Sequence, residues 1–164
     1  SAISIISYQY TYPMPANIKN VKEEKHAELL RSLSLPKSTR AIILTDIADA
    51  DILAFLTEAT KAIGVYLFSE KWADLWWVDA YLTLDWQTPS RPDIVGNVIV
   101  PIGPTRGAKE AGFTEFNPMK FEGNSFLFES ADKYQIFASI VRYLENVKYP
   151  GDKRTLLQNV VGEK

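Results

Sequence analysis

Residues 40–64 read RAIILTDIADADILAFLTEATKAIG, and this stretch decides the fold. Its run Ala41–Leu44 is continuously aliphatic, which is typical of a strand buried on both faces. After a polar turn, apolar residues recur at the spacing of one helical face. The helix is expected to end at Gly64, because a residue without a side chain suits the position just past a helix. Val65–Phe68 predicts a second strand, so the stretch indicates a β-α-β unit.

Further elements extend this unit along the chain. Val78–Trp86 alternates between apolar and polar residues, which predicts a strand with one face exposed to solvent. We expect it to be an antiparallel addition to the sheet. Helices are predicted over residues 20–33 and from a cap at Ser130 to Val147, and a third buried strand over residues 97–101. The fold class is therefore α/β: a single three-layer domain with a mostly parallel central sheet, an antiparallel addition, and helices on both faces.

The length of 164 residues suits one such domain, predicted over residues 19–150. An aromatic segment, residues 1–18, precedes it, and a tail, residues 151–164, follows it. The apolar runs fall well short of the ~20 residues that span a bilayer, so no membrane association is expected. The chain begins without the pattern of a signal peptide. We therefore expect a soluble, cytoplasmic protein, of which the sequence leaves the oligomeric state open.

Charge is distributed unevenly along the chain. Residues 19–40 hold six basic and three acidic residues, whereas residues 41–89 hold two basic and eight acidic residues. A protein that binds nucleic acid strongly needs clustered cations to displace counterions from the phosphates. Since no such cluster occurs, strong direct binding of nucleic acid is not expected.

Several kinds of catalytic site are excluded by composition. The chain has one histidine, His26, and no cysteine. Nucleophilic triads need a base beside a serine or cysteine, and zinc sites need several histidine or cysteine ligands. We therefore assign no catalytic residue, no metal ligand and no cofactor.

A loop of carboxylates is the one remaining place for a ligand or a metal ion. Asp46, Asp49 and Asp51 follow the first buried strand, where ligands bind in α/β folds. They could hold magnesium or supply a general base. The alternative is that they cap the helix that follows. Thr105 and Arg106 belong to a second candidate, because their glycine-bearing turn could hold an anion or could simply be a turn.

Aromatic residues suggest a surface for other protein subunits. All four tryptophans lie within residues 71–87, and the alternation places Trp77 and Tyr81 on the polar face of their strand. Exposed aromatic side chains are typical interface anchors, although the cluster could also cover the core or stack on bases. The tyrosines of the first segment could dock on a partner, or the segment could be an edge strand or a frayed end. The candidate partner-binding residues are Tyr8, Tyr10, Tyr12, Trp72, Trp76, Trp77 and Tyr81.

The order of these elements resembles a known fold. The runs Ile43–Thr45, Leu53–Thr57 and Val98–Gly103, followed by a closing hairpin and helix at residues 124–147, are similar to the core of the uracil-DNA-glycosylase-like fold. More particularly, they resemble the non-catalytic psi-subunit family of bacterial DNA polymerase III. Active glycosylases carry Gly-Gln-Asp-Pro after the first strand and a histidine motif after the last. Asp46 matches the first motif loosely and no histidine follows the last strand, so the resemblance is to inactive members.

The resemblance implies an adaptor, in which an N-terminal segment engages a clamp loader and the domain holds another subunit. Our function hypothesis is accordingly a non-enzymatic protein-interaction (adaptor) module of a macromolecular assembly, such as an assembly for DNA replication. One alternative is a metal-dependent or nucleotide-handling enzyme that uses the acidic loop after the first strand. Another alternative, suggested by the size and the aromatic content, is a structural protein of a virus or shell.

Overall fold

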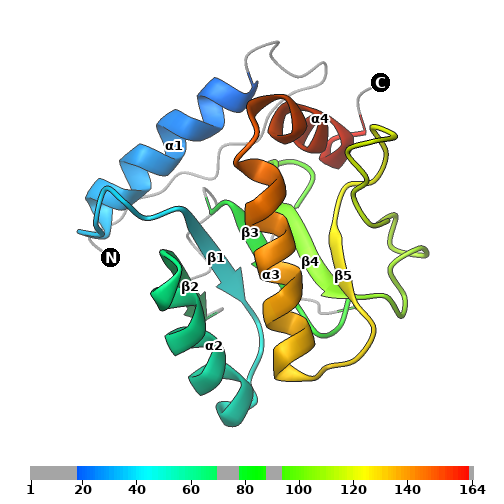
Figure 1. Cartoon of the computed structure of the whole chain (residues 1–164), viewed down its shortest axis with the longest axis horizontal. Helices are drawn as coiled ribbons and strands as arrows, with labels where there is room; N and C mark the ends of the chain where they lie inside the picture. The colour runs from blue at the N-terminus through cyan, green and yellow to red at the C-terminus, as the bar shows by residue number, and fades with distance from the viewer. Residues whose placement is uncertain (1–17, 70–77, 88–93, 163–164) are drawn as a thin grey trace.

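The computed structural model describes residues 18–69, 78–87 and 94–162. Its helices and strands follow one another as an α/β chain (Figure 1). In sequence order the elements are α1 (Ile18–Ser32), β1 (Ala41–Thr45), α2 (Ala50–Ala62), β2 (Val65–Ser69), β3 (Ala80–Leu82), β4 (Val100–Pro104), β5 (Phe126–Phe128), α3 (Lys133–Val147) and α4 (Pro150–Val160). The β-α-β unit predicted over residues 40–68 is confirmed as β1, α2 and β2.

The five strands form one parallel sheet in the order β2-β1-β3-β4-β5. The chain passes from β1 to β2 on one side and then returns to place β3 on the other side of β1. The α/β class and the parallel sheet are therefore confirmed. The predicted antiparallel addition is wrong, because β3 pairs in parallel with both β1 and β4.

The interior position of β3 also shows that the prediction of a solvent-exposed face was wrong. Ala80, Tyr81 and Leu82 are all fully buried. Alternation shows which side chains share a face of a strand, but it does not show whether another element covers that face. A strand between two neighbours is covered on both faces in a sheet of this kind.

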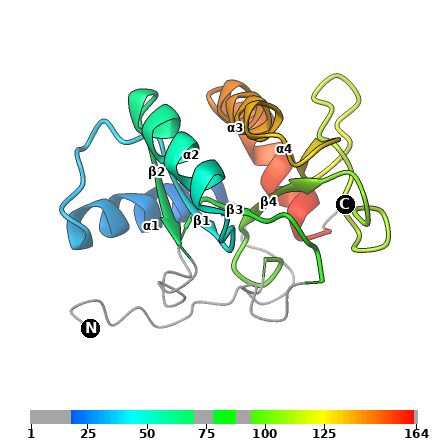
Figure 2. The same ribbon diagram turned by 90° about the horizontal axis from the view of Figure 1, so that it is seen from below.

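Helices flank the sheet, consistent with a three-layer domain. α2 and α3 lie side by side on one face (Figures 1 and 2). α1 and α4 contact each other near the ends at which β1 and β4 begin (Figure 1). None of the helices in the described ranges is both long and apolar enough to cross a bilayer.

The end of the chain differs from the predicted tail. Residues 150–160 form α4, which buries Leu156, Leu157 and Val160. Pro150 begins this helix, a position at which its missing N–H is not needed. α3 is capped by Asp132, whose carboxylate accepts hydrogen bonds from the N–H groups of residues 134 and 135, and not by Ser130 as predicted.

Candidate functional site

The parallel sheet brings the loops after β1, β3 and β4 to one edge. The chain leaves β1 toward β2 in one direction, while β3 lies on the other side of β1. In open α/β sheets, ligands bind outside the carboxyl ends of the strands at such a reversal of strand order. The residues that matter here are those directly after β1, β3 and β4.

Hydrogen bonds tie the first two of these loops together. Thr83, directly after β3, is fully buried, and its hydroxyl lies 2.8 Å from a carboxylate oxygen of Asp46 and 2.9 Å from the carbonyl oxygen of Asp85. The same hydroxyl accepts a bond from the N–H of Asp85. The hydroxyl of Thr45 donates to the carbonyl of Leu82 at 2.8 Å. The loop after β3 therefore has a fixed position relative to the loop after β1.

A pocket of about 470 Å³ lies between the loops that follow β3 and β4. One wall is Trp86, whose indole N–H donates to the carbonyl of Pro104 at 2.7 Å and whose ring lies 4.7 Å from that of Phe113. Gly103 lets the ring approach β4, because a Cβ there would lie 2.6 Å from an indole carbon. The lining residues are Leu84, Asp85, Trp86, Gln87, Pro104, Arg106 and Gly107.

The polar groups of this pocket suit an anionic or hydroxyl-bearing ligand. Arg106 is exposed, and its guanidinium makes no hydrogen bond or ion pair with any residue in the described ranges. A guanidinium binds phosphate or carboxylate through paired hydrogen bonds. Asp85 uses one carboxylate oxygen to accept from the N–H of Gln87. The pocket thus combines a cation, a carboxylate and an amide with apolar walls.

The three predicted aspartates do not converge on one ligand. Asp46 bonds to Thr83, Asp49 caps α2 by accepting from the N–H of residue 52, and Asp51 lies 3.3 Å from the ammonium of Lys133. In the part of the chain that the structure describes, no group of three histidine, cysteine, aspartate or glutamate side chains could hold a metal ion. The capping alternative is therefore the one that the structure supports for Asp49.

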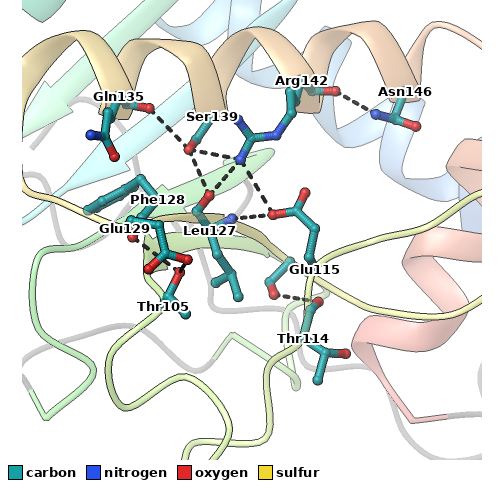
Figure 3. Close-up of polar contacts among 11 residues, drawn as sticks. Thr105, Thr114, Glu115, Leu127, Phe128, Glu129, Gln135, Ser139, Arg142 and Asn146 are labelled. Carbon is teal, nitrogen blue, oxygen red and sulfur yellow. Dashed lines mark hydrogen bonds and ion pairs between the residues drawn. The ribbon is translucent and has the colours of Figure 1, made fainter.

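Thr105 and Arg106 are adjacent in the sequence, but their side chains serve different parts of the structure. Thr105 faces β5: its N–H donates to the carbonyl of Phe128, and its hydroxyl lies 3.2 Å from Glu129 (Figure 3). Of the five predicted loop residues, Arg106 alone lines the pocket. Sequence reasoning missed Asp85, Gln87 and Trp86 as pocket residues. The predicted strand extended to Trp86, whereas β3 ends at Leu82, so the alternation concealed the loop that these residues form.

Most of the predicted partner-binding aromatics lie outside the described residues. Tyr81 is the exception, and it is fully buried in the centre of the sheet. It therefore cannot be an exposed interface anchor. Tyr8, Tyr10, Tyr12, Trp72, Trp76 and Trp77 fall in the ranges for which the structure gives no account.

A second polar cluster closes the outer side of β5 (Figure 3). Glu115 accepts from the N–H of Leu127 at 2.8 Å, and Arg142 donates to the carbonyl of Leu127 at 2.5 Å. Glu115 and Arg142 also lie 3.4 Å apart. Free groups at the edge of a sheet invite pairing with another chain, and these side chains occupy them. We assign this cluster a structural role.

The comparisons with known proteins give a likeness of fold. No family model matches the sequence, and no curated protein matches it. Among solved structures, the chain is similar to the catalytic domain of starch synthase IV from Arabidopsis thaliana bound to ADP and acarbose. The TM-score is 0.64 at 15% identity, and the match covers 87% of this chain and 39% of the other.

This likeness corrects the resemblance drawn from the sequence. The structural match is to the catalytic domain of a starch synthase, and it contradicts the resemblance to the uracil-DNA-glycosylase-like fold and the psi subunit. The resemblance rested on aliphatic strands and ordinary helices in a given order. Many α/β folds share such elements, so their order alone does not identify a family.

Proposed function

We propose that this chain binds a nucleotide in the pocket between the loops after β3 and β4, with the phosphates held by Arg106. The observation that carries the proposal is the pocket itself, at the carboxyl edge of a parallel sheet, with a guanidinium that no described residue engages. Apolar lining comes from Leu84, Trp86 and Pro104. The proposal concerns binding and assigns no catalytic residue.

Two further points support this ligand class. The pocket volume of about 470 Å³ lies within the roughly 300–1,000 Å³ typical of small-molecule sites. The starch synthase domain of similar fold is bound to ADP. At 15% identity this likeness concerns the fold alone. Because that domain is bound to ADP, we choose ADP as the first ligand to test with the present chain.

Arg106→Ala is expected to weaken ADP binding by roughly 10- to 100-fold, since a hydrogen bond to a charged group contributes about 1.5–3 kcal/mol. Isothermal titration calorimetry of the full chain with ADP measures this. Lys109→Ala is the matched control. Lys109 is an exposed cation three positions after Arg106, and it does not line the pocket. Its affinity for ADP is expected to equal that of the unchanged chain.

Inorganic phosphate and acarbose complete the titration series. Weak phosphate binding that is lost in Arg106→Ala would support recognition through the phosphates. If the folded chain gave no binding heat with millimolar ADP, or if both variants bound ADP equally well, the proposal would be wrong. Binding of acarbose alone would move the assignment from nucleotides to carbohydrates.

We retain the adaptor function as a second candidate, because one turn presents two large apolar side chains. Met119 is 87% exposed and Phe121 is 70% exposed. Asn117 accepts from the N–H of Met119, and Asn159 of α4 donates to the carbonyls of Phe121 and Gly123. A rigid turn loses little conformational freedom on binding a partner. A place in a replication assembly and a cytoplasmic location remain predictions.

The combined variant Met119→Ala and Phe121→Ala tests this candidate. If the turn is an anchor for another protein, affinity for that protein is expected to fall at least about 30-fold, since anchor residues contribute 2 kcal/mol or more. The partner is first identified by affinity capture and mass spectrometry, and binding is then measured with the purified partner. Lys120→Ala in the same turn is the control. Equal affinity of the double variant and the control would refute the assignment.

A further inference from the structure

A partly buried polar cluster lies at the opposite end of the sheet from the pocket. His26 of α1 places its Nδ1 2.8 Å from a carboxylate oxygen of Asp79 and its Nε2 3.0 Å from the carbonyl oxygen of Thr39. The His26 and Asp79 side chains are only 20% and 12% exposed. Asp79 directly precedes β3, and the same carboxylate oxygen accepts from the N–H of Ile42 in β1 at 2.8 Å. This cluster therefore connects α1 to the starts of β1 and β3.

The contacts of His26 favour its charged form. Both of its ring nitrogens face acceptors, namely a carboxylate and a carbonyl, and only the imidazolium carries an N–H on both nitrogens. Burial acts to lower the pKa of His26, but the hydrogen bond and charge of Asp79, together with the carbonyl of Thr39, outweigh it and raise that pKa above 6.5. A neutral ring would leave one acceptor without its donor.

Asp79 is held in its charged form by the same contacts. Burial acts to raise its pKa, yet the hydrogen bond and charge of His26, the charge of Lys22 and the N–H of Ile42 lower it below 3.8. The other charged or titratable groups that face this pair are Lys22 on α1, Lys153 on α4 and Tyr143 on α3. Lys153 disfavours a positive charge on His26, so Asp79 is the charged group that favours it.

We propose that His26 makes α1 a pH-sensitive clasp, held on the sheet while the ring is charged and loosened when the ring becomes neutral. α1 contributes Leu29 and Leu30 to the core, so loosening the helix uncovers apolar surface. The folded pKa of His26 lies above its unfolded value, so its contribution to stability is complete below about pH 6.5 and is lost as the pH rises through the folded pKa. Asp79 adds stability that is lost only in acid.

Two measurements on the full chain test the clasp. Because His26 is the single histidine, its ring signals in an NMR titration give its pKa directly. Hydrogen exchange followed by mass spectrometry, corrected for intrinsic exchange rates, gives the protection of residues 18–32 at pH 5.5 and pH 8. We expect the protection factor of α1 to fall about tenfold for each unit by which the pKa of His26 exceeds 6.5. α3, residues 133–147, serves as the internal reference and is expected to change much less.

His26→Gln supplies the variant test. Glutamine keeps one donor but cannot titrate, so α1 is expected to be less protected at pH 5.5 and to lose its dependence on pH. A His26 pKa at or below 6.5 would overturn the proposal. So would equal changes of α1 and α3 with pH, or a pH dependence that His26→Gln preserves. The NMR result stands even if the variant folds poorly.

Discussion

Gly123→Ala is expected to destabilise the protein by about 2–5 kcal/mol, as the sum of a left-handed backbone cost of about 1–2 kcal/mol and an overpacking cost of about 1–3 kcal/mol. Gly123 has φ +88°, and a Cβ there would overlap the carbonyl oxygen of Glu115 and lie 2.6 Å from the Cα of Phe116. Both obstacles are backbone atoms, which cannot move aside as a flexible side chain would.

The clash acts on a contact that supports the core. The carbonyl of Thr114 accepts from the N–H of Ser125, and the carbonyl of Ser125 accepts from the N–H of Phe116. These bonds hold the Phe116 ring, 5% exposed, at 6.1 Å from the ring of Phe126. Separating the two segments to admit a methyl group would weaken this packing.

Gly112→Ala is the matched control for this variant. Gly112 has the same φ of +88°, but a Cβ there meets nothing within 4 Å. It is therefore expected to show the backbone cost alone, about 1–2 kcal/mol. Urea unfolding followed by circular dichroism gives both free energies. Equal losses in the two variants would show that the close approach at Gly123 does not constrain the fold.

Lys22→Met is expected to abolish a rise in stability at alkaline pH. Lys22 is 4% exposed, and its ammonium donates to the carbonyls of Val78 and Asn97. Burial, together with Lys153, lowers its pKa from 10.5 to about 8, although Asp79 acts to raise it. Between these two values the folded chain releases a proton that the unfolded chain retains, so stability increases with pH.

The size of this rise in stability follows from the shift in the pKa of Lys22. At about 1.4 kcal/mol per pKa unit, the free energy of unfolding gains about 3 kcal/mol between pH 8 and pH 10.5 relative to Lys22→Met. Urea unfolding at a series of pH values measures the difference between the two curves. Lys109→Met, which removes an exposed lysine, is expected to give a curve parallel to that of the unchanged chain. Parallel curves for Lys22→Met as well would contradict the account of Lys22.

The two titrating residues of α1 have opposite effects on how stability changes with pH. Neutralisation of His26 removes stability above about pH 6.5, whereas neutralisation of Lys22 restores stability above about pH 8. The difference arises because His26 has a carboxylate partner that favours its charge, while Lys22 donates to two carbonyls in a site that disfavours charge. The variants His26→Gln and Lys22→Met therefore separate the two effects.

The site could be predicted only in part. The sequence predicted a ligand loop after β1, but the pocket lies between the loops after β3 and β4, and Arg106 is the one predicted loop residue that lines it. Asp46, Asp49 and Asp51 have different roles, which the sequence could not distinguish. The partners of Asp46 and Asp51 lie far away in the chain. Lys133, for example, pairs with Asp51 across 82 positions.

The sequence alone determined the unit of β1, α2 and β2, since its signals are local. An unbroken aliphatic run, a helical spacing of apolar residues, the cap at Asp49 and the left-handed Gly64 act within a few residues of one another. Only the tertiary structure decided the direction of β3 and the pairing of polar side chains. His26 meets Asp79 across 53 positions, and Thr83 meets Asp46 across 37. Periodicity fixes the face on which a side chain lies, whereas its neighbours depend on how distant strands and helices pack.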